Sequence, residues 1–265
     1  MITVLRLELR RGRSLVLWVG LIAVLYAGII TAFYPTILQN AAEFAKMMAI
    51  YPRELMAAFG ISGDLSAPGT FINSYIFQFL WPLVAAIVAI FLATRVAADA
   101  TSGFLDLPLS SRLPRAPYLL ASIAAQVVGL AVLAAVTIGA VWFVDLFIEP
   151  DFATERLALA GVHAFVFGLA LAGVTTALSV VFLDRGRAGG LVAAVLILMY
   201  LLNVIAQLSP DLRGLANLSA FHYFDLKPLI DAGAYPFGDS AIYLTVAIVG
   251  WLVALLAFRR RDLAA

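Results

Sequence analysis

The sequence has 265 residues, of which 64% are hydrophobic and only 12% charged. Soluble domains carry about 25% charged residues, so most of this chain's surface must meet lipid rather than water. The formal net charge of +1 excludes a protein that binds nucleic acid through a basic face. Cysteine is absent, which excludes disulfides, thiolate catalysis and cysteine-ligated metals.

The N-terminal stretch, MITVLRLELRRGRS, places four arginines ahead of the first long apolar run. That run is too long for the apolar part of a secretory signal, and no small-residue cleavage site follows it. We therefore expect no cleavable signal here. Leu5, Leu7 and Leu9 alternate with arginines, a pattern that fits an anchor on the positively charged inner side of a membrane.

Six apolar runs are each long enough to cross a bilayer. A transmembrane helix needs about 20 mostly apolar residues to span a hydrocarbon core of about 30 Å. These runs are continuously apolar rather than alternating, which predicts helices and not a β-barrel. The sequence therefore predicts a single all-α integral membrane domain over residues 1–265. Its expected spans are residues 14–33, 71–94, 118–147, 157–183, 188–208 and 240–258.

Two local patterns bear on how these spans pack. The pair Trp81-Pro82 predicts a kink in the second span, because proline removes a backbone donor and crowds the preceding turn. Small residues recur one turn apart in the third and fourth spans, where they would let helix backbones approach closely; alanine-rich spans also produce this spacing by chance. They are Ala121, Ala125 and Gly129, and Ala164, Gly168 and Ala172.

The segment between the first two spans, residues 34–70, contains apolar residues at helical spacing. This spacing predicts a helix that lies on the outer membrane surface or caps the bundle. The apolar residues are Phe44, Met47, Met48, Tyr51, Leu55 and Phe59.

Six spans place both termini on one side of the membrane, and the basic residues indicate which side. Twelve of the 17 lysines and arginines fall on the side that holds the N-terminus, and each segment on that side contributes. Because positive charge accumulates inside, we expect both termini to be cytoplasmic. The twelve are Arg6, Arg10, Arg11, Arg13, Arg95, Arg112, Arg115, Arg185, Arg187, Arg259, Arg260 and Arg261.

Arg95 opens the long inner loop at residues 95–117. Its sequence VAADATSGFLDLPL predicts a short helix that Gly103 interrupts and Pro108 ends. We expect Asp99 to face the cytoplasm beside apolar residues that a partner protein could hold. The alternative is an ordinary polar turn with interfacial anchors.

This loop, RVAADATSGFLDLPLSSRLPRAPYLLASI, resembles the loop between the second and third helices of ABC-2-type permeases, the membrane subunits of one class of ABC transporters. That family usually has a glutamate run where this chain has Asp99 alone, and a leucine pair where it reads Leu105-Asp106-Leu107. The matching residues are Asp99, Thr101, Ser102, Gly103, Leu105, Leu107, Pro108, Ser111 and Arg112.

Three further stretches resemble the same family, in chain order. YPRELMAAFGI at residues 51–61 is similar to an outer-loop helix of some members. LSAFHYFDLKPLIDAG at 218–233 is similar to the last outer loop, with Ala220 where proline is common. FRRRDL at 258–263 is similar to the cytoplasmic end.

The resemblance implies a coupling helix at residues 96–107 that docks into a groove on a separate cytoplasmic ATPase subunit. It also implies that residues 2–13 form an interface helix along the inner membrane surface, the alternative being the bare positive anchor described above. The residues implied in coupling are Asp99, Thr101, Ser102, Gly103, Phe104, Leu105 and Leu107.

The resemblance further implies an assembly of two ATPase subunits and two permease protomers, as a homodimer or a heterodimer, in a bacterial cell membrane. ATP and Mg would bind in the ATPase, and no cofactor would bind in this chain. Export is the usual direction of transport in the family.

A translocation path would then run between the protomers, lined in part by the second and fifth spans. Apolar walls with a few amides favour an amphipathic cargo, either lipid-like or drug- or peptide-like. The alternative role for these amides is hydrogen bonding between helices. The candidate lining residues are Asn73, Gln78, Asn203 and Gln207.

The chain has no phosphate-binding loop of its own. Such a loop needs glycines followed by a lysine, and the two lysines, Lys46 and Lys227, lie in outer segments and follow no glycine. ATP hydrolysis is therefore expected in a partner, and this chain is not expected to be an enzyme.

Two other functions remain open on the sequence. An ion-coupled secondary transporter would need ionisable groups at mid-bilayer depth, and no Asp, Glu, Lys or Arg falls there. A membrane-embedded enzyme would need a cluster such as His222, Asp225 and Asp231, which lack a recognised metal-binding spacing, so we assign no metal site. We expect His163 to face the interior of the bundle.

Overall fold

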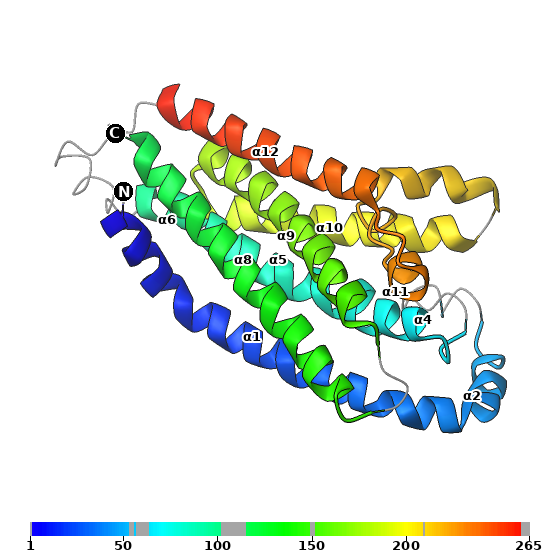
Figure 1. Cartoon of the computed structure of the whole chain (residues 1–265). Coiled ribbons are helices and arrows are strands. Elements are labelled where there is room, and N and C mark those ends of the chain that lie inside the picture. The colour runs from blue at the N-terminus through cyan, green and yellow to red at the C-terminus, as the bar shows by residue number, and fades with distance from the viewer. Residues whose placement is uncertain are drawn as a thin grey trace.

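The computed structural model describes residues 2–52, 56, 64–101, 115–148, 152–208 and 210–260. All regular secondary structure in this part of the chain is helical (Figure 1). Six of its helices are long and apolar enough to cross a membrane, which confirms the number and order of the predicted spans and makes the chain a multi-pass membrane protein. They are Ile2–Gln39, Pro68–Thr101, Ala116–Asp145, Thr154–Phe182, Arg185–Gln207 and Phe237–Arg260.

The first span is one continuous helix, α1 (Ile2–Gln39), of 38 residues. At a rise of 1.5 Å per residue it is about 57 Å long, well beyond a hydrocarbon core of about 30 Å. Residues 2–13, for which the sequence left an interface helix or a bare positive anchor open, form the first turns of α1. The helix stops where the Asn40 side chain donates to the carbonyl of Thr36, at 2.9 Å.

The second span is assembled from several helical segments. These are α4 (Pro68–Ile72), the π-helical stretch η1 (Asn73–Leu80), α5 (Trp81–Ala93) and α6 (Arg95–Thr101). The change from π- to α-helix falls at Trp81-Pro82, where the sequence predicts a kink. Proline has no N–H to donate to the carbonyl one turn earlier, and its ring crowds that carbonyl, which lies within η1.

The remaining spans are single helices: α8 (Arg115–Asp145), α9 (Thr154–Phe182), α10 (Arg185–Leu208) and α12 (Phe237–Arg260). Shorter helices occur between them.

Three short helices lie in the segments predicted to be outside. α2 (Ala41–Met48) confirms a helix after the first span, whereas Leu55 and Phe59 lie outside the described residues. The 3-10 helix η2 (Pro210–Leu218) and α11 (Lys227–Ala232) belong to the last of these segments.

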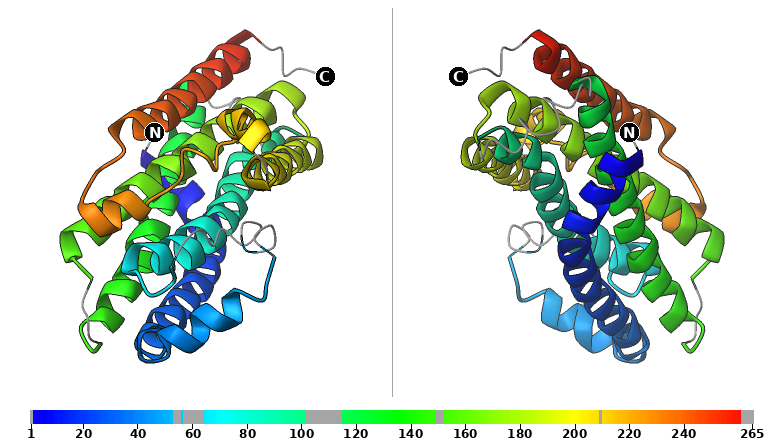
Figure 2. Two further views of the ribbon diagram at one scale, coloured as in Figure 1. Left: turned by 90° about the vertical axis from the view of Figure 1, so that its right-hand side faces the viewer. Right: turned by 90° about the vertical axis from the view of Figure 1, so that its left-hand side faces the viewer.

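The second span and α9 form the centre of the bundle. In their most apolar stretches 61% of residues are buried, against 28% in α1, 22% in α12 and 17% in α10. α1 packs along α8, and α12 packs along α9. Seen end-on, α1 and α12 lie at opposite edges (Figure 2). The exposed faces of α1, α10 and α12 are therefore the ones left for lipid or for another protein.

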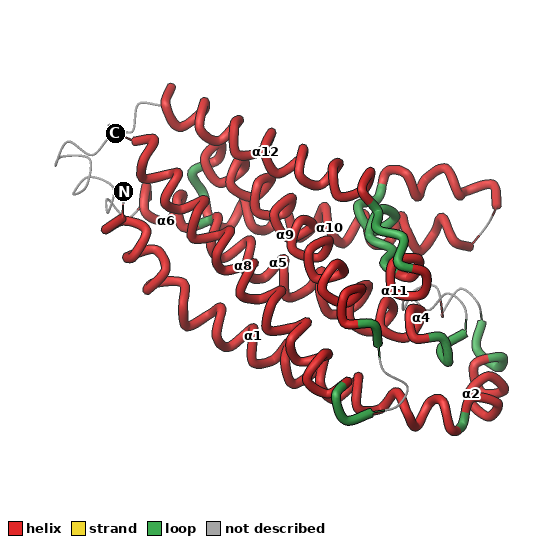
Figure 3. The backbone as a smooth tube through the Cα atoms, viewed as in Figure 1, coloured by secondary structure: helices red, strands yellow, loops and turns green. Residues whose placement is uncertain are grey.

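The start of α1, the end of α12 and α6 lie at one end of the bundle, called here the terminal end (Figure 1). α2, α4 and α11 lie at the opposite end, called the loop end, where much of the irregular backbone gathers (Figure 3). An even number of spans requires both termini to share one end.

Candidate functional site

At the terminal end, the first residues of the predicted coupling segment are held by an ion pair whose carboxylate is buried. Arg11 of α1 donates from both terminal nitrogens to Asp99 of α6, at 2.8 Å and 2.7 Å. The hydroxyl of Tyr118, from α8, donates to the same carboxylate at 2.6 Å. One carboxylate thus joins three spans, and a two-pronged guanidinium contact fixes its orientation as well as its charge.

A second pair lies beside the first. Arg95 donates to the backbone carbonyl of Glu8 at 3.1 Å, and its guanidinium is 3.7 Å from the Glu8 carboxylate. Glu8 also accepts from Arg11 at 3.2 Å. The close approach of α1 depends on Gly12, because a Cβ there would lie 2.7 Å from a methyl of Leu92.

Glu8, Arg11, Arg95 and Asp99, called here the charge cluster, carry two positive and two negative charges. Glu8 is 2%, Asp99 1% and Arg95 6% exposed. Buried charges are tolerated only when each has a partner, and here the formal charges cancel. The cluster therefore fastens α6 to α1 without a net buried charge.

The expectation that Asp99 faces the cytoplasm is wrong. The side chain points inward because Arg11, 88 residues earlier in the chain, supplies the opposite charge at the same depth. Thr101 turns its hydroxyl onto the carbonyl of Ala97 in its own helix, at 3.1 Å.

The other predicted coupling residues lie outside the described part of the chain. They are Ser102, Gly103, Phe104, Leu105 and Leu107. The structure describes the start of the predicted coupling helix as α6, which also meets α9 where the Ala97 N–H donates to the Ser179 hydroxyl, at 3.3 Å.

Near the loop end, the four amides predicted to line a path share one cavity of about 470 Å³. Three segments contribute its polar lining: the second span, α10 and the stretch before α11. Its polar residues are Asn73, Gln78, Asn203, Gln207, Arg213, His222 and Asp225.

Two of these amides also hold the segment before α11 in place. Asn73 donates to Asp225 at 2.8 Å and accepts from the Leu226 N–H at 2.9 Å, while Gln78 donates to the Phe224 carbonyl. The other role that the sequence suggests for these amides is hydrogen bonding between helices. The structure shows these two amides bonded to the segment before α11 instead, which fixes one wall of the cavity.

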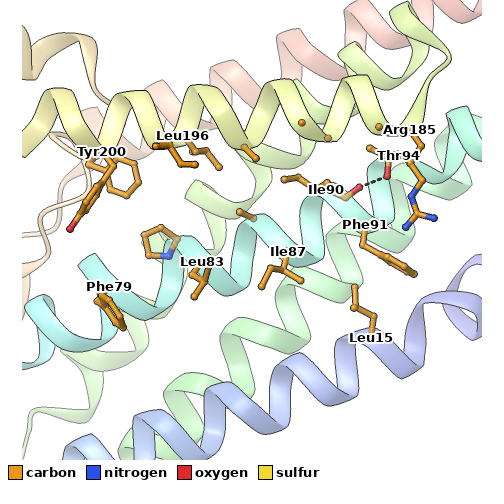
Figure 4. Close-up of a pocket in the computed structure, with 18 of the residues that line it drawn as sticks. Leu15, Phe79, Leu83, Ile87, Ile90, Phe91, Thr94, Arg185, Leu196 and Tyr200 are labelled. Atoms are coloured by element: carbon orange, nitrogen blue, oxygen red, sulfur yellow. Dashed lines mark hydrogen bonds between the residues drawn. The ribbon is translucent and has the colours of Figure 1, made fainter. Parts of the chain in front are cut away.

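An apolar groove of about 920 Å³ runs between α5 and α10 from this cavity toward the terminal end. Gln78 and Phe221 line both hollows, so the polar cavity and the apolar groove are neighbours. Figure 4 shows Phe79 near one end of the groove and Arg185 at the other. Together they make a surface that is polar near the loop end, apolar along its length and cationic at the terminal end.

The residues considered for an enzyme do not form one site. His222 and Asp225 line the polar cavity. Asp231 instead accepts from the Gly69 N–H at 2.7 Å. Among the described residues, no group of three or more His, Cys, Asp or Glu is placed to hold a metal ion.

His163 is buried, as the sequence predicts. Its ring nitrogens lie 2.7 Å from the Ser240 hydroxyl and 3.3 Å from the Tyr223 carbonyl. These contacts tie α9 to α12 and to the last outer segment.

Sequence reasoning missed the partners of Asp99 and the cation of the groove. Glu8 had a signal, since it is the one acidic residue among the N-terminal arginines. An isolated carboxylate in a basic segment suggests an internal pair. Tyr118 and Arg185 had no comparable signal, because each resembles an ordinary residue at the end of a membrane helix.

Comparison of the sequence with models of protein families and with curated proteins finds no match.

Proposed function

We propose that this chain is the transmembrane permease subunit of an ATP-driven ABC transporter of the ABC-2 type. A separate ATPase subunit, in two copies, would bind ATP and Mg, and a second permease protomer would complete the path. The support is the resemblance of the inner loop together with six spans in the expected order.

The terminal end is cytoplasmic in this proposal, because twelve of the 17 basic residues belong to that side. The membrane is that of a bacterial cell. The segment that follows Thr101 then faces the cytosol, where an ATPase can reach it.

The observation that carries the proposal is the attachment of α6 to three neighbouring spans. It is continuous with the second span, is joined to α1 through Arg11 and Asp99, and meets α8 through Tyr118. A force applied to the segment after α6 would therefore move these spans together. A loose polar turn would absorb that movement, so such an attachment favours a coupling role.

The neighbouring groove and cavity support an amphipathic, exported cargo. Its apolar part would lie along α5 and α10, and its polar part would meet the amides near the loop end. Drug- or peptide-like amphiphiles fit this surface as well as lipid-like ones. The path would be completed by the second protomer, because α10 leaves most of its surface unburied within this chain.

Two single variants, Gly103→Pro and Phe104→Asp, each expressed in the native host, test the coupling segment. We expect at least about nine-tenths of the co-purifying ATPase to be lost. An unpaired charge buried in an apolar docking contact costs several kcal/mol, and each 1.4 kcal/mol lowers the affinity tenfold. Pull-down from solubilised membranes followed by mass spectrometry measures the bound protein.

Arg187→Ala in the other inner turn is the matched control and should retain the ATPase. Equal retention by all three variants would contradict the coupling role. An ion-coupled transporter would instead show gradient-driven transport by the reconstituted chain alone.

A further inference from the structure

The groove between α5 and α10 has the length and lining of a site for an extended apolar chain. Gln78 and Thr94, at its two ends, are 16 residues apart, or about 24 Å along a helix. That is most of the depth of a hydrocarbon core. Figure 4 shows Leu83 and Ile87 along one wall and Leu196 on the other.

A guanidinium lies at the terminal end of this groove. Arg185 stacks over the ring of Phe91, 5.1 Å from its centroid. Arg95 lies over the same ring at 5.8 Å, but it is paired with Glu8.

The nearby acid does not neutralise this cation. Asp184 is 3.5 Å from the guanidinium of Arg187 and accepts from the Arg187 N–H at 2.9 Å. In the described part of the chain no carboxylate forms an ion pair with Arg185. Among the described residues, the apolar groove therefore ends at a positive charge without an ion-pair partner.

We infer that this groove binds an anionic phospholipid, with the phosphate on Arg185 and one acyl chain along α5. A planar guanidinium can meet a phosphate with two parallel hydrogen bonds, and an attached acyl chain fills the apolar wall. A zwitterionic lipid would fill the same wall but offers no net charge to Arg185. Under the proposed topology this lipid belongs to the inner leaflet.

This inference goes beyond the proposed function, because a lipid can occupy the groove whether or not an ATPase drives the chain. The test therefore uses the purified full chain alone. Failure of lipid binding leaves the coupling proposal intact, and failure of ATPase association leaves the lipid site intact.

The probes are phosphatidylglycerol and phosphatidylcholine with identical chains, each with a photoactivatable group at the end of one chain. Cross-linked peptides are identified by mass spectrometry. We expect phosphatidylglycerol adducts on α5 and α10 and fewer from phosphatidylcholine. Arg185→Ala should lower the phosphatidylglycerol adducts about fivefold, the effect of about 1 kcal/mol per basic residue near a lipid surface.

Arg187→Ala is the matched control, since it removes the same charge two residues away but its own partner is Asp184. It should change the adducts less than about twofold, as expected for an exposed cation that already has a partner.

A second pair of variants tests the acyl-chain wall. A Cβ on Gly190 meets nothing within 4 Å, so Gly190→Leu should fold and yet fill the groove it lines. Both lipids should then lose their adducts. Gly139→Leu, at an equally open position outside the groove, should retain them.

Three results would overturn the inference. Equal labelling by the two lipids would show that the lipid charge plays no role. Equal losses of phosphatidylglycerol adducts in Arg185→Ala and Arg187→Ala would show a general effect of surface charge and not a site at Arg185. Competition by glycerol phosphate without chains would show an anion site and not a lipid site.

Discussion

Replacing Asp99 by alanine is expected to lower the free energy of unfolding by about 3 kcal/mol. The change removes the acceptor of two hydrogen bonds from Arg11 and of one from the buried Tyr118 hydroxyl, and a hydrogen bond to a charged group contributes about 1.5–3 kcal/mol. The total stays low because the Arg11 side chain is 33% exposed, retains some water and keeps its contact with Glu8. Unfolding of the purified chain in mixed micelles with a rising fraction of dodecyl sulfate measures the change.

Arg187→Ala is the matched control, since it breaks another aspartate–arginine pair at the same end of the bundle and keeps the hydrogen bond from the backbone N–H of residue 187 to Asp184. That pair is exposed, with its side chains 79% and 46% accessible. An exposed pair contributes about 0–1 kcal/mol, so we expect a loss below about 1 kcal/mol. Equal losses in the two variants would refute the special role of the charge cluster.

A double variant separates two roles of Asp99. Combining Arg11→Met with Asp99→Leu removes both members of one pair and leaves Glu8 and Arg95 as a neutral pair. We expect most of the lost stability to return, since apolar residues often replace a buried ion pair at little cost. If stability returns and ATPase association does not, the charges of this pair are themselves needed for association. If both return, the pair only positions the segment.

Gly173→Ala is expected to cost about 3 kcal/mol, the upper end of the usual range for overpacking. A Cβ at this position would lie 2.5 Å from the carbonyl oxygen of Ala247 and 2.7 Å from its Cα. These are backbone atoms of α12, so no side-chain rotation relieves the contact and the helices must separate. The same micelle unfolding measures the loss.

Gly250→Ala tests the same crossing from the other side, because its Cβ would lie 2.5 Å from the backbone of Gly173. The double variant should cost less than the sum of the two, since either change alone already separates the helices. Gly139→Ala is the control; its Cβ meets nothing within 4 Å, and alanine should gain up to about 1 kcal/mol in a helix. A loss at Gly139 equal to that at Gly173 would contradict this explanation.

The spans and their order could be predicted from the sequence because their signal is local. Lipid offers no hydrogen bonds, so any run of about 20 apolar residues must satisfy its backbone as a helix. The sequence also singled out Asn73, Gln78, Asn203 and Gln207 as path-lining residues; the structure places all four around one cavity, and their role in a path stays a prediction.

The packing of the spans was a weaker prediction. Gly168 does face α8, where a Cβ would lie 3.2 Å from a methyl of Leu130, but Gly129 faces Leu92 of α5. The close contact between helix backbones lies at Gly173 and Gly250, between α9 and α12. A small residue allows another helix to approach closely, but it does not determine which helix does so.

The sequence by itself determined that this chain spans a membrane six times, because apolar length and backbone hydrogen bonding act within each segment. Tertiary structure alone decided that Asp99 turns inward to Arg11, and that Arg185 closes an apolar groove. Both depend on which helix lies beside which, and partners 88 residues apart leave no periodic trace in the sequence.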